Sequence, residues 1–256
     1  MNRNEDIQYE DVVSKVPQLT FLFWILKIAA TTLGETGGDA VTMSMNLGYL
    51  TGTAIFAAIF IVAVVVQIKA KQFHPFIYWS TIIATTTVGT TLADFADRSL
   101  GIGYAGGSSI LLALLITSLV VWRWSLGTVS VESINTPGAE IFYWVTIMFS
   151  QTLGTALGDW VADSAGLGYL GGAAIFSGIL VGVVLLYFLT RISRTVLFWI
   201  AFIITRPLGA VVGDFLDKPV QSGGLALSRY TASLVLLVFI AGCLLIFRQK
   251  PAATAH

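Results

Sequence analysis

Residues 144–170, WVTIMFSQTLGTALGDWVADSAGLGYL, contain the spacing that decides the fold. In this stretch Trp144 precedes Gly154 by ten positions, Asp159 follows that glycine by five, and Gly168 follows it by fourteen. The same spacings recur three times, at Trp24, Gly34, Asp39 and Gly48, at Trp79, Gly89, Asp94 and Gly103, and at Trp199, Gly209, Asp214 and Gly223. Four gapless occurrences predict a structural unit that is present four times.

A longer period lies above this repeat. The first and third units are offset by 120 positions, and so are the second and fourth. Residues 47–50 and 167–170 are both LGYL, and DFAD at 94–97 becomes DFLD at 214–217. The pattern indicates an ancestral hairpin that was duplicated twice, giving two pseudo-symmetric halves.

The composition places these units in a membrane. The chain has 256 residues, of which 56% are hydrophobic and only 11% charged, whereas soluble domains average about a quarter charged. A span needs about 20 mostly apolar residues. Eight segments qualify: 19–44, 49–68, 76–97, 104–124, 140–162, 168–190, 195–217 and 225–247. We therefore predict an all-α membrane protein of about eight transmembrane helices, arranged as four parallel αα-hairpin repeats.

Basic residues predict the orientation. An even number of spans leaves both termini on one side, and the loops on that side hold nine Lys and Arg residues against three opposite. This excess favours cytoplasmic termini in a bacterial inner membrane. The expected organisation is a polar N-terminus (1–18) without signal-peptide features, a first half (19–126), a linker (127–139), a second half (140–248) and a cytoplasmic tail (249–256).

Each unit carries a pair of acids in its first helix. The second acid lies three or four positions from the repeated aspartate, on the same helix face, where like charges repel unless a proton or cation lies between them. The candidate metal ligands are Asp39, Asp94, Asp159, Asp214, Glu35, Asp97, Asp163 and Asp217. The alternative is that these acids are solvated helix ends or structural ion-pair partners.

Polar residues precede the aspartates in every unit. Candidates for a hydrophilic pathway or gate are Thr32, Thr87, Gln151, Thr152 and Arg206. Alternatively, the hydroxyls bond their own helix backbone. We expect Arg206 to form an interior ion pair, whereas Lys27 is expected to snorkel to the inner face of the membrane.

The repeated glycines have the spacing of a helix-packing motif. Small residues four apart allow helices to approach closely. The positions are Gly34, Gly38, Gly89, Gly154, Gly158, Gly209 and Gly213. A broken helix with ion-binding carbonyls is the alternative.

The Gly-Asp motifs of the odd spans and the LGY segments that follow them resemble a bacterial family of uncharacterised membrane-anchored proteins. That family is built from a repeat of unknown function, and the resemblance covers about residues 19–247. It implies the same helical fold and an inner-membrane location, but it brings no substrate.

The residues favour a secondary transporter or exporter of a hard inorganic cation. Carboxylates and hydroxyls suit Mn²⁺, Mg²⁺ or Ca²⁺, while one cysteine and two histidines argue against a soft-metal site. We expect a divalent metal such as Mn²⁺ with protons as counter-ion. The expected partners are lipid and the cation, with no resident cofactor and no nucleic acid; a homodimer is left open. A cation or proton channel and a membrane scaffold or sensor subunit remain alternatives, and no hydrolase motif suggests an enzyme.

Overall fold

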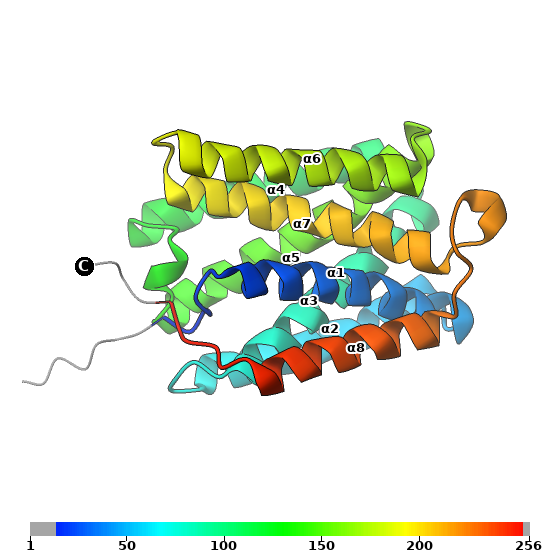
Figure 1. Ribbon diagram of the computed structural model, residues 1–256. Helices are drawn as coiled ribbons and strands as arrows, with labels where there is room; N and C mark the ends of the chain where they lie inside the picture. The colour runs from blue at the N-terminus through cyan, green and yellow to red at the C-terminus, as the bar shows by residue number, and fades with distance from the viewer. Residues whose placement is uncertain (1–13, 253–256) are drawn as a thin grey trace, which may run out of the picture.

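The computed structural model describes residues 14–252, and within them the chain forms eight long helices that run alongside one another (Figure 1). Their bounds are α1 Phe21–Asp39, α2 Gly48–Lys69, α3 Pro75–Asp94, α4 Tyr104–Leu126, α5 Pro137–Asp159, α6 Gly168–Leu189, α7 Arg194–Asp217 and α8 Arg229–Ile246. This confirms the all-α class and the four helical hairpins. Helix α7 continues unbroken through Pro207.

Each hairpin turns at the last glycine of the repeat. Gly48, Gly103, Gly168 and Gly223 all have φ between 65° and 87°. A side chain is disfavoured in this left-handed region, so glycine is the residue that permits the reversal. The last position of the motif is therefore a requirement of the turn.

Three of the odd helices change character directly after their aspartate. Short π-helical turns cover Ala40–Ser44, Phe95–Ser99 and Trp160–Ser164, whereas α7 stays α-helical to Asp217. A π turn places an extra residue in the turn, so side chains beyond it face a different direction.

The four odd helices form a closed inner ring. Contacts join α1 to α3, α3 to α5, α5 to α7 and α7 back to α1. Each even helix packs outside the inner helix of the next repeat, as α2 does on α3, and α8 completes the cycle on α1. The ring therefore closes within one chain with pseudo-fourfold symmetry.

The repeated glycines lie where neighbouring inner helices meet. A Cβ atom on Gly34, Gly89, Gly154 or Gly209 would come within 2.5–3.0 Å of the Cβ atom of a residue on the next inner helix. In every case the neighbour stands three positions before that helix's own glycine. These neighbours are Thr86, Gln151, Arg206 and Thr31, respectively. Gly38, Gly158 and Gly213 make similar close approaches one turn later.

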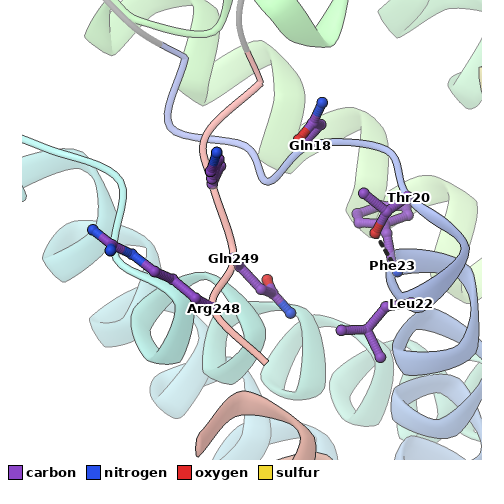
Figure 2. Close-up of a pocket in the computed structure, with 7 residues that line it drawn as sticks. Gln18, Thr20, Leu22, Phe23, Arg248 and Gln249 are labelled. Carbon is purple, nitrogen blue, oxygen red and sulfur yellow. Dashed lines mark hydrogen bonds between the residues drawn. The ribbon is translucent and has the colours of Figure 1, made fainter. Parts of the chain in front are cut away.

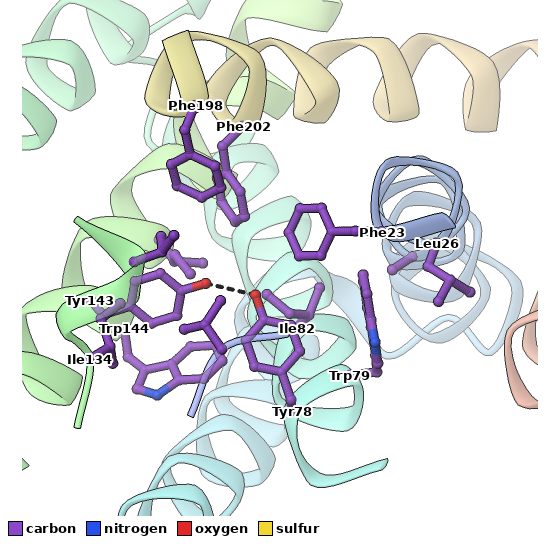
Figure 3. Close-up of a cluster of buried hydrophobic side chains, with 14 of the residues drawn as sticks. Phe23, Leu26, Tyr78, Trp79, Ile82, Ile134, Tyr143, Trp144, Phe198 and Phe202 are labelled. Carbon is purple, nitrogen blue, oxygen red and sulfur yellow. Dashed lines mark hydrogen bonds between the residues drawn. The ribbon is translucent and has the colours of Figure 1, made fainter. Parts of the chain in front are cut away.

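An aromatic core fills the end of the ring where both ends of the described chain lie (Figures 1 and 3). Phe23, Tyr78, Tyr143 and Phe198 occupy one position of the repeat, and the two tyrosine hydroxyls are 2.6 Å apart. Trp79 and Trp144 pack here at 2% exposure or less. These two repeated tryptophans are therefore core residues.

The next layer toward the aspartates contains Lys27, Ile82, Ile147 and Phe202, all with no exposed surface. Above it comes the polar layer of Thr31, Thr86, Gln151 and Arg206. Along the axis of the ring, the interior side chains therefore change from aromatic to apolar to polar, and the last layer consists of the acids.

Five helices are long and apolar enough to cross a membrane: α2, α4, α6, α7 and α8. Their length and composition make a membrane protein plausible, with α2, α4, α6 and α8 presenting apolar side chains outward. Helices α1, α3 and α5 do not meet that criterion. Their buried faces carry the threonines, glutamine and acids of the ring interior, which lower their mean hydropathy.

The segments before α1 and after α8 are tied together at the aromatic end. Pro17 pairs with Pro251, and the Lys15 ammonium lies 2.6 Å from Glu140 at the start of α5. A pocket beside the start of α1 is lined by Gln18, Thr20, Arg248 and Gln249 among others, and it contains none of the candidate acids (Figure 2).

Candidate ion-binding site

The four repeated aspartates gather in one layer at the far end of the inner ring. Helices α1, α3 and α5 end at Asp39, Asp94 and Asp159, and the last turn of α7 contains Asp214. Each of these aspartates is at most 3% exposed. The parallel arrangement of the repeats brings them to one depth. They are therefore not solvated helix ends, which was one alternative from the sequence.

Two basic side chains divide this layer into two pairs. Arg98 lies 3.0 Å from Asp94 and 2.9 Å from Asp159. Lys218 lies 3.0 Å from Asp214 and 2.6 Å from Asp39. Each base follows its own aspartate by four positions and reaches the aspartate of the next repeat. The two bases are 120 positions apart, so the bridges obey the twofold symmetry of the halves.

Lys218, which bridges Asp39 of α1 and Asp214 of α7, carries a permanent positive charge. Burial alone disfavours the charged form of Lys218, but Asp214, Asp39 and Asp217 together raise the pKa of its ammonium above the ordinary lysine value. Lys218 is consequently a fixed cation among these carboxylates at neutral pH.

Three carboxylates converge beside Lys218. Asp39, Asp214 and Asp217 each offer an oxygen atom, and these atoms lie within 4.8 Å of one another. Arg229 at the start of α8 approaches Asp217 at 2.8 Å and Asp39 at 3.7 Å. One oxygen of Asp39 and one of Asp217 are buried without a hydrogen-bond partner among the described residues. These atoms are free to coordinate a cation.

A second charged group lies one turn deeper. Arg206 donates to Glu35 at 3.1 Å, and both side chains are at most 3% exposed. The same guanidinium donates to the hydroxyls of Thr90 on α3 and Thr155 on α5. The interior ion pair expected for Arg206 is present, and its contacts reach all three other inner helices. Thr90 and Thr155 directly follow a repeated glycine, a signal that the sequence reading did not use.

Asp97 and Asp163 do not join the cluster. Asp97 is buried against Gly107 of α4, with neither carboxylate oxygen hydrogen-bonded to a described residue. Asp163 is exposed to the surroundings of the protein. Asp163 therefore does not share the buried environment of Asp159, and the expected acid pair of this unit does not form one buried site.

The threonines of the predicted pathway bond their own helices. The hydroxyls of Thr32, Thr87 and Thr152 each donate to the carbonyl four residues earlier. These bonds agree with the alternative interpretation, in which the hydroxyls bond their own helix backbone. Gln151 differs, since its side chain is fully buried and both amide atoms lack a partner among the described residues.

The position of the Lys27 side chain differs from the prediction made from the sequence. We expected it to snorkel to the membrane surface, yet its side chain is fully buried and its ammonium lies 4.1 Å from the centre of the Phe202 ring. Lys27, Thr31 and Glu35 are four residues apart, so they share the inward face of α1. That spacing was the available signal.

The acid end carries more negative than positive charge. Six buried carboxylates take part in its ion pairs, namely Glu35, Asp39, Asp94, Asp159, Asp214 and Asp217, while the seventh buried acid at this end, Asp97, has no ion-pair partner among the described residues. Four cationic side chains contact them, namely Arg98, Arg206, Lys218 and Arg229. With all groups ionised, this ion-paired network has a formal excess of two negative charges, which one divalent cation or two protons would neutralise.

The comparison with protein families matches this repeat. A family described as Repeat of Unknown Function (DUF347) matches residues 22–73, 77–128, 142–193 and 197–249. The chain belongs to the DUF347 family. Each DUF347 repeat contains one inner helix, the acid-end turn and the following outer helix, so the family unit and the structural hairpin coincide. No curated protein and no solved structure matches the chain.

Proposed function

We propose that this DUF347 protein is a secondary transporter of a hard inorganic cation, with a divalent metal such as Mn²⁺ as substrate and protons as counter-ion. The observation that carries the proposal is the buried carboxylate cluster of Asp39, Asp214 and Asp217, within an ion-paired network that has two more carboxylates than cations. Buried ionisable residues in membrane proteins typically mark ion pathways.

The donor chemistry supports a hard cation. Carboxylate oxygens are the ligands that Mn²⁺, Mg²⁺ and Ca²⁺ prefer. In the arrangement described, the Lys218 ammonium lies between two of the three carboxylates and occupies the position of a cation. Entry of a metal ion would displace it, and its departure would restore the lysine bridge. Two protons on the same carboxylates would neutralise the same excess charge and allow electroneutral exchange.

The membrane arrangement is part of the proposal. All eight helices cross the bilayer, with the polar faces of α1, α3 and α5 hidden inside the ring. The excess of basic residues in the termini-side loops supports cytoplasmic termini, with the acid end at the opposite face of a bacterial inner membrane. Because the ring closes within one chain, the proposed site needs no second subunit.

Flux into proteoliposomes tests the proposal. Purified protein would be offered a panel of Mn²⁺, Mg²⁺, Ca²⁺ and Na⁺ while internal pH is followed with an enclosed dye. We expect saturable uptake of a divalent cation with opposite proton movement. Flux that rises without saturation would indicate a channel, and absence of flux from folded protein would refute transport.

One observation favours a second candidate, a membrane scaffold or sensor subunit. Each of the four repeated aspartates already has a basic partner, which is what a purely structural network requires. Neutral substitutions would then impair assembly without removing a specific flux. Folding and flux of the same Asp→Asn variants therefore separate the two candidates.

A further inference from the structure

The centre of the inner ring contains a set of buried polar atoms that the acid end does not use. Lys27 Nζ, Thr86 Oγ1, Arg206 Nε and both amide atoms of Gln151 lack a hydrogen-bond partner among the described residues. Each of these four side chains is fully buried. Buried polar groups nearly always have partners, so such a group of unpaired atoms calls for one.

These atoms occupy two successive layers of the repeat. Thr86, Gln151 and Arg206 take the same repeat position on α3, α5 and α7, and each side chain fits against a glycine of the preceding inner helix. From this position the Arg206 guanidinium contacts Thr31 on α1 and Thr90 on α3. A side chain at this repeat position can therefore extend into the centre of the ring. Lys27 lies one turn below Thr31 and extends across to Phe202 on α7.

The charge of Lys27 has no described counter-charge. The other members of its layer are Ile82, Ile147 and Phe202. Glu35 is two turns away along α1, about 12 Å, and its carboxylate is already paired with Arg206. An uncompensated ammonium costs several kcal/mol in a dry interior and would lose its proton instead, so a charged Lys27 requires an anion beside it.

We propose that Lys27 and Gln151 bind a small monovalent inorganic anion, of the chloride class, at the centre of the ring. The ammonium supplies the charge, and the Gln151 amide, the Arg206 Nε–H and the Thr86 hydroxyl supply further donors. Water could satisfy the amide and the hydroxyl, but only an anion would keep the Lys27 amine protonated between them. This site lies on the aromatic side of the Arg206–Glu35 pair, and it does not depend on cation transport at the acid end.

Thermal unfolding in detergent tests this site. Wild-type protein would be melted across a series of potassium chloride concentrations, with potassium gluconate keeping the ionic strength constant because gluconate is too large for the buried site. We expect the Tm to rise by several degrees and to saturate with chloride. Lys27→Met should abolish the dependence on chloride, whereas Lys71→Met, which removes an exposed lysine, should keep it.

A Tm that is equal in chloride and gluconate would overturn the proposal, as would an unchanged chloride effect in Lys27→Met. Because that variant could fail to fold, bromide provides a second measurement on the wild type. Anomalous diffraction from crystals soaked in bromide should give a peak between Lys27 Nζ and Gln151 Nε2. Well-ordered crystals without a peak there would equally refute the site.

Discussion

Removing Lys218 tests whether it occupies the position of a metal ion. Lys218→Met retains much of the aliphatic stem but leaves Asp39 and Asp214 without the ammonium that lies 2.6 Å and 3.0 Å from them. Loss of one partner of a buried ion pair costs roughly 3–5 kcal/mol. The Lys218 side chain is 13% exposed, and Arg229 also approaches Asp39, so we expect a loss of about 3 kcal/mol.

The variant should gain a response to metal in return. With the ammonium gone, Asp39, Asp214 and Asp217 keep three oxygen atoms within 4.8 Å and hold an uncompensated negative charge. A ligand at about 100 times its Kd stabilises a protein by about 2.7 kcal/mol, so saturating Mn²⁺ should restore most of the lost stability.

Thermal melts in detergent with and without Mn²⁺ measure both effects. Lys71→Met is the matched control, since it makes the same substitution at an exposed position at the other end of the helices. If Mn²⁺ stabilises Lys218→Met no more than this control, the reasoning that Lys218 and the metal share one position is refuted. A variant as stable as the wild type would equally refute the estimate of the ion pair.

Three further predictions follow from the ring. Gly154→Ala would place a Cβ 2.5 Å from that of Arg206 and should cost about 1–3 kcal/mol, whereas Gly178→Ala on α6 meets nothing within 4 Å and should be neutral or stabilising in the same melts. Arg206→Met leaves Glu35 buried and unpaired and should cost roughly 3–5 kcal/mol; adding Glu35→Gln should recover part of the lost Tm, and no recovery would contradict a direct pair. Because its aspartate neighbours raise the pKa of Lys218, its pairs should hold below the ordinary lysine pKa and be lost only as pH rises through the raised value. The Tm difference between wild type and Lys218→Met should therefore stay constant from about pH 7 to about pH 10, and a decline at pH 8 would contradict the assignment.

The repeat register explains why so much of the architecture is readable from the sequence. One motif contains the packing glycine, the buried aspartate and the turn glycine at fixed spacing, so locating it four times predicts the hairpins and the shared depth of the acids. The inner ring follows because residues such as Thr86 and Arg206 occupy the same repeat position and meet the same glycine of the helix before them.

The remaining features depend on interactions that spacing alone does not contain. Asp163 is exposed although its spacing from Asp159 predicts a shared helix face, because burial at this end depends on which neighbouring elements cover each side chain. The burial of Lys27 depends on which face of α1 points inward, whereas the sequence led us to expect a side chain that snorkels to the inner face of the membrane. The partner choices of Arg98 and Lys218 required the order of helices around the ring.

Transport by a matched pair of variants tests the central claim most directly. Asp214→Asn and Asp163→Asn remove the same charge near the same end of the bundle, but only Asp214 belongs to the buried cluster. Mn²⁺ uptake into proteoliposomes would be measured for both variants and the wild type, each shown to be folded. The proposal predicts wild-type uptake for Asp163→Asn and none above empty liposomes for Asp214→Asn. Equal uptake by the two variants, or none by the wild type, would contradict it.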